Sequence, residues 1–230
     1  MKEIERELLQ SGEDKSCILL FSGGIDSTIL LFLLKKLNYK INILTINYNG
    51  RNPKELEACK KIIDLAKPDN FIIVDLNFLK ESITLWEELQ NNIMKEIVSN
   101  LPTYYIPARN MIFISIAAYY AESLGASFIF TGHVKDDSEI LPDVNERFIS
   151  LFNEIFKHST YLGRNKRLEL KMPFLNLKKL DLAELALKHE VPLQYTWSCY
   201  ELTEMQCGKC RGCIQRKYFL EIFDEIKRKR

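Results

Sequence analysis

The sequence has no excess of charge of either sign. Its 230 residues carry 32 Lys and Arg against 31 Asp and Glu, which gives a formal net charge of +1. A strongly basic chain would attract nucleic acid or an anionic membrane surface, and this balance supports neither. We therefore expect no direct nucleic-acid partner. The local basic run at residues 227–230 is interpreted as a solvated helix end, because cations suit a helix C-terminus.

Long apolar runs are also missing. The run at residues 111–121 falls short of the about 20 apolar residues that a membrane-spanning helix needs. Residues 1–9 are charged and do not contain the apolar region of a secretory signal. The sequence therefore predicts no membrane partner and a cytoplasmic location.

Internal repeats and low-complexity stretches are absent, and strand-like segments instead alternate with helix-like ones. Short apolar or β-branched runs predict strands at residues 17–21, 41–46, 71–75, 127–131 and 168–172. Helical spacing predicts helices at residues 27–38, 53–66, 82–99, 110–124, 143–158, 177–189 and about 214–227. This alternation predicts an α/β fold with a doubly wound, mainly parallel sheet, whose ligands bind beyond the C-terminal strand ends.

Two common nucleotide-binding patterns do not occur. The chain contains neither Gly-x-x-x-x-Gly-Lys-Ser/Thr nor Gly-x-Gly-x-x-Gly. Residues 22–27 instead read Ser-Gly-Gly-Ile-Asp-Ser, between the first predicted strand and the first predicted helix. Glycines let backbone amides approach an anion, and a helix N-terminus attracts it. We predict a phosphate-binding loop, with a tight structural turn as the alternative. The residues expected to bind the nucleotide are Phe21, Ser22, Gly23, Gly24, Ile25, Asp26, Ser27 and Thr28.

Histidine is scarce, and cysteine is clustered. The three histidines, His133, His158 and His189, are interpreted as structural or surface residues. Four of the six cysteines lie within one short segment, at Cys199, Cys207, Cys210 and Cys213. Zinc favours a tetrahedral set of thiolates, which close cysteine pairs supply. We predict a structural zinc site near the C-terminus, with an iron–sulfur cluster as the alternative.

The hexapeptide at residues 22–27 resembles the Ser-Gly-Gly-x-Asp-Ser signature of the ATP-pyrophosphatase (PP-loop) superfamily. The resemblance implies an adenine nucleotide alpha hydrolase-like fold. It also implies that the loop holds the pyrophosphate leaving group while a substrate takes AMP. We expect the α/β domain to span residues 1–190, with a four-cysteine zinc segment and C-terminal helix at 191–230 packed on the same core.

Six stretches, in order, resemble the 7-cyano-7-deazaguanine synthase family. They are the loop at residues 22–27, Tyr48-Asn-Gly-Arg51, Ile106-Pro-Ala-Arg-Asn110, Thr131-Gly132 with Pro142-Asp143, Pro173 with Lys179, and Thr196-Trp-Ser-Cys-Tyr200 with Cys207-Gly-Lys-Cys-Arg-Gly-Cys213. The last stretch is the most discriminating, because other branches of the superfamily do not end in this zinc segment.

The resemblance implies an ATP-dependent carbon–nitrogen ligase. ATP would adenylate 7-carboxy-7-deazaguanine, ammonia would displace AMP to give the amide, and a second adenylation would lead to the nitrile. The product would serve queuosine or archaeosine synthesis in tRNA. The implied cofactors are ATP, Mg²⁺ and Zn²⁺, and the family also favours a homodimer.

Site roles follow from the resemblance and from the chemistry. Pyrophosphate departure needs electrostatic stabilisation, for which the expected catalytic residues are Ser22, Asp26, Ser27, Arg109 and Lys179. The expected substrate-binding residues are Arg109, Asn110, Asp137 and Asp143. Among the loop carboxylates, Asp143 is the first choice for reading the N–H donors of the ring and Asp137 the second. Phe148 or Tyr105 would stack on the ring. The alternatives are a helix cap at Asp143, a structural helix start at Arg109 and Asn110, and a solvated lysine at Lys179.

Two stretches depart from the family pattern. Tyr48-Asn-Gly-Arg-Asn52 stands where the family usually has Tyr-Gly-Gln-Arg-His. Glu139-Ile-Leu-Pro-Asp-Val144 stands where it usually has Ser-Gly-Tyr-Pro-Asp-Cys. The altered second stretch keeps open an adenylating enzyme with another acceptor. A tRNA sulfur transferase of the same superfamily and a non-catalytic nucleotide-binding module are further alternatives.

Overall fold

The computed structural model describes residues 2–9, 15–48, 51–79, 106–139 and 141–229. Within these residues the centre is a five-stranded sheet in the order β3-β2-β1-β4-β5, with every neighbouring pair parallel. The strands are β1 (Ser16–Leu20), β2 (Lys40–Tyr48), β3 (Asn70–Leu76), β4 (Phe128–Thr131) and β5 (Glu169–Lys171). All five predicted strands are therefore confirmed, with ends displaced by a few residues.

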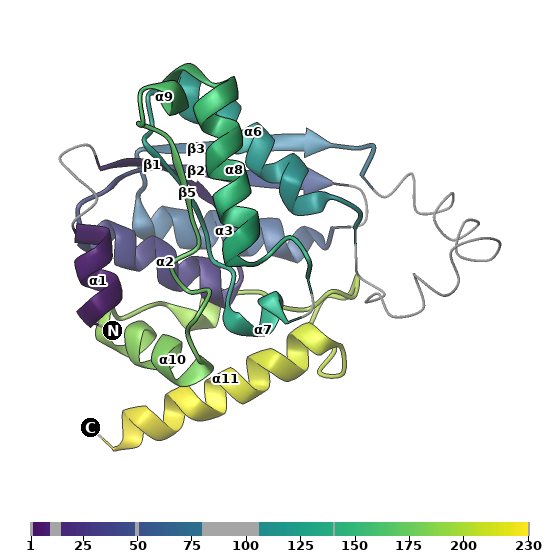
Figure 1. Cartoon of the computed structure of the whole chain (residues 1–230). Coiled ribbons are helices and arrows are strands. Elements are labelled where there is room, and N and C mark those ends of the chain that lie inside the picture. The colour runs from purple at the N-terminus through teal and green to yellow at the C-terminus, as the bar shows by residue number, and fades with distance from the viewer. Residues whose placement is uncertain (1, 10–14, 49–50, 80–105, 140, 230) are drawn as a thin grey trace.

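Helices cover both faces of the sheet (Figure 1). One layer contains α1 (Lys2–Leu9), α2 (Ile25–Lys36), α3 (Pro53–Ala66), α10 (Lys179–Lys188) and α11 (Arg211–Arg228). The other contains α6 (Arg109–Leu124), α8 (Glu146–Ser159) and α9 (Tyr161–Arg164). Side chains alternate along each strand, so Leu19 joins the first core and Ile18 the second. The doubly wound α/β fold is confirmed.

Some helices differ from the predictions. The helix predicted from residue 143 begins at Glu146, because the Asn145 side chain caps it by accepting the Phe148 N–H at 2.9 Å. Asp143 is therefore not the helix cap. The last helix begins at Arg211, three residues earlier than predicted, and includes the fourth cysteine. The predicted helix at residues 82–99 lies outside the described residues.

Three short elements and an N-terminal helix were not predicted. They are α1, α7 (Lys135–Ser138), α9 and a 3-10 turn, η1 (Leu193–Tyr195). The α1 helix buries Ile4 and Leu8, and the Tyr39 hydroxyl donates to the Leu8 carbonyl at 2.7 Å. The helix was not predicted because charged residues dominate this segment, and only two apolar residues, four positions apart, pack on the core.

Among the described residues, no helix combines the length and the apolar composition that a bilayer crossing requires.

The strand order reverses direction between β1 and β4. The chain runs outward from β1 through β2 to β3 and then returns to the other side of β1. Leu20 pairs in register with both Leu44 and Thr131, so β1 and β4 end at the same level, whereas β2 continues to Tyr48. Crevices at such a reversal are the usual ligand sites of parallel sheets. The phosphate-loop residues, Arg51 and Gly132 therefore meet at one edge.

Candidate active site

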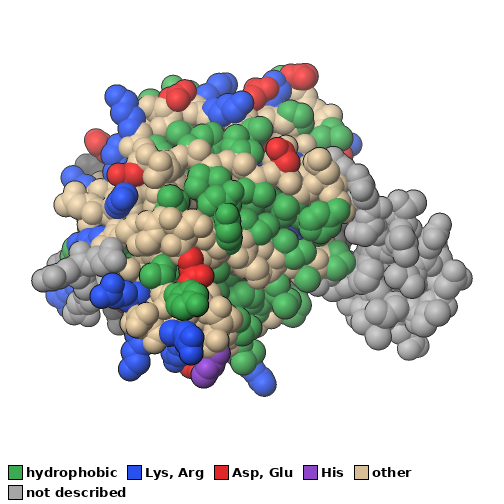
Figure 2. Space-filling model, turned by 90° about the horizontal axis from the view of Figure 1, so that it is seen from above, with side chains coloured by type: hydrophobic (Ala, Val, Ile, Leu, Met, Phe, Trp, Pro, Cys, Tyr) green, Lys and Arg blue, Asp and Glu red, His purple; other side chains and the backbone are tan. Residues whose placement is uncertain are grey.

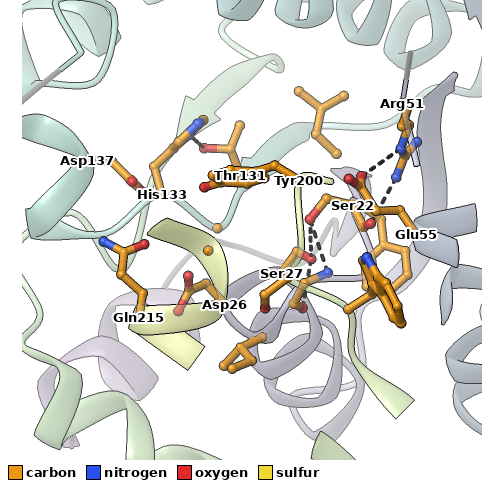
Figure 3. Close-up of a pocket in the computed structure, with 18 of the residues that line it drawn as sticks. Ser22, Asp26, Ser27, Arg51, Glu55, Thr131, His133, Asp137, Tyr200 and Gln215 are labelled. Carbon is orange, nitrogen blue, oxygen red and sulfur yellow. Dashed lines mark hydrogen bonds and ion pairs between the residues drawn. The ribbon is translucent and has the colours of Figure 1, made fainter. Parts of the chain in front are cut away.

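A cavity of about 790 Å³ opens at this edge of the sheet (Figure 3). Pockets for small ligands usually measure about 300–1,000 Å³, so this one has room for a nucleotide-sized molecule. Its walls come from the segments after β1, β2 and β4 and from the first turns of α6, α10 and α11. Elements far apart in the sequence thus supply one site.

The predicted phosphate loop forms one end of the cavity. The Oγ atoms of Ser22 and Ser27 lie 3.1 Å apart, and the Gly24 N–H donates to Ser22 Oγ at 3.2 Å. The Thr28 hydroxyl donates to the Gly24 carbonyl at 2.6 Å, which fixes the first turn of α2. The loop is therefore held in shape by its own side chains, with the N-terminus of α2 directed at the cavity.

Gly23 has no room for a side chain. Its φ is +79°, and an added Cβ would lie 2.8 Å from Cys59 Sγ and 3.0 Å from the Glu55 carbonyl oxygen. Gly132 is similarly confined, because an added Cβ would lie 2.9 Å from the Ser27 nitrogen. These two glycines let α3 and the residue after β4 pack closely against the loop.

Arg51 ties the loop to the end of β2. Its guanidinium donates to the Ser22 carbonyl at 2.9 Å and to the Ile46 carbonyl, and it pairs with Glu55 at 2.8 Å. Arg51 is only 9% exposed, so these contacts satisfy a buried charge. The sequence contained Arg51 in a family stretch, but we had not assigned it to the site.

Asp26 and Lys179 face each other beside the loop. Lys179 Nζ lies 3.7 Å from Asp26 Oδ1, and the Lys179 side chain is 12% exposed. Lys179 is therefore not a solvated helix lysine. Burial raises the pKa of Asp26 to about 6; Lys179 opposes that rise, and the nearby carboxylates Asp137 and Asp136 add to it. The carboxyl is mostly ionised at neutral pH and titrates close below it.

The predicted substrate residues divide into two groups. Arg109, Asn110 and Asp137 line the cavity, and Asn110 is 4% exposed. Arg109 and Asn110 are also the first two residues of α6, so they line the cavity and start the helix at the same time. Asp143 does not belong to the lining, and its Oδ1 is buried without a hydrogen-bond partner among the described residues. Asp137 is thus the loop carboxylate that the structure brings into the wall.

The expected stacking residues are not part of the described wall. Phe148 packs on Phe152, with ring centroids 4.8 Å apart, and Tyr105 lies outside the described residues. Aromatic side chains of other segments line the cavity instead, among them Tyr48, Phe113, Trp197 and Tyr200.

His133 also lines the cavity. Its Nδ1 lies 2.8 Å from Thr131 Oγ1, at the end of β4. The other two histidines match their predicted roles, because His158 is 83% exposed and His189 pairs with Glu5 at 3.1 Å. A histidine two residues after a strand that ends at the sheet's ligand edge was the signal in the sequence that could have placed His133 in the site.

The four clustered cysteines form a group compatible with zinc. Their sulfur atoms all lie within 4.8 Å of one another, and the pairs Cys207–Cys213 and Cys199–Cys210 are each 3.9 Å apart. Zinc–sulfur bonds of about 2.3 Å in a tetrahedron separate the sulfurs by about 3.8 Å, close to these values. Backbone amides of Cys210 and Lys209 lower the pKa of Cys207 to about 6, which favours the thiolate that a metal needs.

The segment that carries the cysteines closes the cavity. The Trp197 backbone N–H donates to the Gly23 carbonyl at 3.0 Å. Tyr200, which follows Cys199, and Gln215, two residues after Cys213, both line the cavity. Figure 3 shows Gln215, from α11, beside Asp26 and Asp137. Gly212 permits this packing, because an added Cβ would lie 1.9 Å from the Ser198 carbonyl oxygen. We had assigned only metal ligands in this segment and missed these wall residues.

Comparison with known proteins agrees with this geometry. The family model described as "Queuosine biosynthesis protein QueC" matches residues 16–224, which include both the phosphate loop and the cysteines. The chain belongs to the QueC family. Two relatives are each 38% identical to it, one from Nautilia profundicola (88% of this chain and 91% of the relative) and one from Picrophilus torridus (91% and 90%). A third, from Thermoplasma acidophilum, is 33% identical (93% and 91%). All three are named 7-cyano-7-deazaguanine synthase.

The QueC match confirms the predicted family over most of the chain. A solved NMN synthetase from Francisella tularensis superposes with a TM-score of 0.52 at 14% identity, covering 97% of this chain and 93% of that one. At that identity the likeness extends to the fold alone. It agrees with the predicted α/β fold.

Proposed function

We propose that this QueC-family chain converts 7-carboxy-7-deazaguanine, ATP and ammonia into 7-cyano-7-deazaguanine through adenylated intermediates, for queuosine or archaeosine modification of tRNA. The observation that carries the proposal is the joint arrangement of the cavity. An anion-binding loop stands at one end, and Arg109 and Asp137 line the wall, in a chain that matches the family from residue 16 to 224.

Adenylation overcomes the low reactivity of the substrate carboxylate. A carboxylate is a poor electrophile because its leaving group would be oxide, and transfer of AMP gives it a good one. The departing pyrophosphate needs positive charge and N–H donors held in place in advance. The loop amides, the hydroxyls of Ser22 and Ser27, and the Lys179 ammonium have these properties. Mg²⁺, which supplies charge neutralisation to phosphates when bound, would be held beside the loop by Asp26.

Ring recognition falls to the part of the wall formed by α7 and the start of α6. The deazaguanine edge presents adjacent N–H donors, which a carboxylate accepts well. In the proposal Asp137 takes this role, because it lines the cavity and Asp143 does not. Arg109 offers a fork of donors to the ring carboxylate, and Asn110 offers an amide beside it. Tyr200 gives a flat apolar surface for the ring.

The four cysteines are proposed to hold a structural Zn²⁺. Four thiolates fill a tetrahedral zinc, so no position stays open for substrate. The metal would fix residues 191–230 as one segment on the α/β domain of residues 1–190. Phe219, which is 1% exposed, packs into the core on the α2 side and supports this division into a domain and a docked segment.

A homodimer and free ammonia complete the proposal. Figure 2, which views the molecule from the side of α9, shows hydrophobic side chains gathered across that face. Exposed apolar residues of α6, α8 and α9 include Tyr119 (66% exposed), Leu151 (54%) and Tyr161 (78%). A patch of this kind marks an interface in a soluble protein. Ammonia is assigned as the nitrogen donor because the proposed reaction needs one and the family resemblance implies it.

One observation favours a second candidate. Leu141 lines the cavity where the family pattern usually has tyrosine. The loss of a hydroxyl and a ring changes the shape of the wall, which would suit an adenylating enzyme with another acceptor.

The experiment that tests the proposal measures AMP release from Mg-ATP with and without the ring acid. Release that requires 7-carboxy-7-deazaguanine supports the main proposal. AMP release that does not depend on the ring acid but increases with another carboxylate supports the second candidate.

A further inference from the structure

His133 is a cavity residue to which the proposed reaction has so far given no role. It lies two residues after the end of β4, at the point where the strand order reverses, and it lines the same cavity as Asp26 and Lys179. Figure 3 shows its side chain beside Thr131 and Asp137, across the cavity from Arg51 and Glu55. This position puts the imidazole on the side of the cavity where the deazaguanine ring is proposed to bind.

One ring nitrogen of His133 is anchored and the other is not. Nδ1 lies 2.8 Å from Thr131 Oγ1. Nε2 has no hydrogen-bond partner among the residues that the structure describes. When Nδ1 carries the proton and donates to the threonine, Nε2 keeps its lone pair and can accept a proton. Thr131 itself is 2% exposed and belongs to the sheet, so the anchor is rigid.

The surroundings keep this imidazole neutral. Burial lowers the pKa of His133 below its ordinary 6.5. The other facing charges partly cancel, because Asp137 of α7 raises the pKa, Arg109 of α6 lowers it and Asp143 of the loop before α8 raises it. A neutral histidine at pH 7 is ready to act as a base, and a base whose pKa lies near the working pH is the most effective.

The proposed reaction needs such a base at its last step. After the second adenylation, the former amide carbon carries the oxygen bound to AMP and a nitrogen with two protons. One proton leaves to give a neutral imidate. When the second N–H bond breaks, its electron pair becomes the third carbon–nitrogen bond, and the carbon–oxygen pair leaves with AMP. Each nitrile therefore requires a group that accepts a proton from nitrogen inside the cavity.

We propose that Nε2 of His133 is the general base that removes the nitrogen proton as the nitrile forms and AMP departs, an inference that rests on the proposed function. The same nitrogen takes the proton released when ammonia displaces AMP in the first half of the reaction. First adenylation moves no proton from nitrogen, so it does not need this base. The proposal therefore separates two halves of one catalytic cycle.

Two substitutions distinguish a base from a structural histidine. Asparagine at 133 keeps an amide N–H near the position of Nδ1, so it preserves the donor to Thr131 but places nothing at Nε2. Glutamine reaches toward the Nε2 position with a group that is not basic. His158→Asn is the matched control, because His158 is 83% exposed. Melting temperatures establish that each variant is folded.

The assay gives each protein Mg-ATP with either the ring acid, to follow first adenylation, or the ring amide, to follow nitrile formation. We expect both His133 variants to lose nitrile formation by about 100-fold or more, the usual contribution of a general base. This loss should exceed their loss in first adenylation by at least about tenfold. Asp26, with a pKa of about 6, serves both adenylations, so the pH profile of first adenylation is the reference. The wild-type nitrile-forming rate should fall more steeply than this reference at acidic pH, and the His133 variants should lose the excess.

Three results would overturn the inference. Nitrile formation by His133→Asn within about threefold of the wild-type rate would leave His133 only its anchoring role. A loss that is equal in both half-reactions would make it a positioning residue. A wild-type pH profile for nitrile formation that matches the profile for first adenylation would exclude a titrating base. A wild-type protein that makes no nitrile from acid or amide would instead refute the proposed function, before any variant is compared.

Discussion

The ammonium of Lys179 lies 3.7 Å from the carboxylate of Asp26, beside the phosphate loop. The two residues come from α10 and α2, helices whose sequence positions are far apart, and they meet only because α10 packs against α2 in the first core. The pair sets a negative and a positive group where the proposal needs a magnesium ligand and a phosphate contact. Its charge balance also governs how the site responds to pH.

Lys179→Met should reduce ring-dependent ATP cleavage at pH 7 by about 100-fold in kcat/KM, the usual effect of removing one charged donor from a transition state. It should also shift the acid limb. Asp26 is active when ionised, so the rate falls as pH drops through its pKa of about 6. Lys179 lowers that pKa, and its removal should move the limb to higher pH. The measurement is the pH profile of AMP release.

The control for this prediction is Lys178→Met, because Lys178 is exposed and does not line the cavity. It should keep the wild-type rate and profile. An acid limb that stays in place in Lys179→Met would contradict the electrostatic account of Asp26.

Gly23→Ala should destabilise the fold as well as reduce ATP cleavage. The residue has φ +79°, and the new Cβ would meet Cys59 Sγ at 2.8 Å. A non-glycine residue in such a conformation costs on the order of 1–3 kcal/mol. Thermal or urea unfolding measures the loss. Gly24→Ala is the comparison for stability, because Gly24 has φ −77° and its Cβ would meet only the Ser22 side chain, at 3.2 Å, and the Trp197 carbonyl, at 3.8 Å. Equal stability of the two variants would refute the steric argument.

Cys210→Ser should remove most of the bound metal and lower the melting temperature by about 10 °C or more, because a structural zinc contributes its binding energy to folding. Metal analysis and thermal unfolding test both effects. Met205→Ala, in the same segment and 80% exposed, should change neither. Zinc retained in full by Cys210→Ser would contradict the four-cysteine site, and iron with labile sulfide in the wild type would replace zinc with a cluster.

Arg51→Lys should raise the KM for ATP by about tenfold, with a smaller effect on ring binding. Lysine keeps the charge but cannot make the three separate contacts to Ser22, Ile46 and Glu55 that hold the loop. Steady-state kinetics with each substrate varied in turn separates the two effects. The exposed Arg147→Lys serves as the control. An unchanged KM for ATP would show that the loop keeps its shape without the guanidinium.

The sequence predicted the sheet and the phosphate loop well, for local reasons. A run such as Cys17 to Leu20 can bury all its side chains only as a central strand, and Gly23 followed by a helix leaves few structures other than an anion-binding turn. The metal site at the four cysteines could also be predicted, because their short spacing in the sequence brings the thiolates together. In each case the residues that decide the structure are neighbours in the chain.

The rest of the site depends on contacts between distant segments. Asp143, the first choice, and Asp137, the second, lie close together in the sequence, and only the structure of the segment around α7 decides which of them enters the cavity. Tyr200 and Gln215 reach the cavity because the Trp197 backbone N–H donates a hydrogen bond to the Gly23 carbonyl. No local sequence pattern predicts this contact between distant segments. The helix cap was misjudged for a smaller reason, since Asn145, two residues after Asp143, is the better cap.

The most direct test of the account is one reaction mixture of purified protein, Mg-ATP, ammonia and 7-carboxy-7-deazaguanine, analysed by mass spectrometry. We predict AMP together with 7-cyano-7-deazaguanine, and neither product when the ring acid is left out. AMP with the amide alone would mean that the altered loop at residues 139–144 halts the reaction after its first half. ATP that binds without any ring product would contradict the central claim and leave only an adenylating fold whose acceptor is a different molecule.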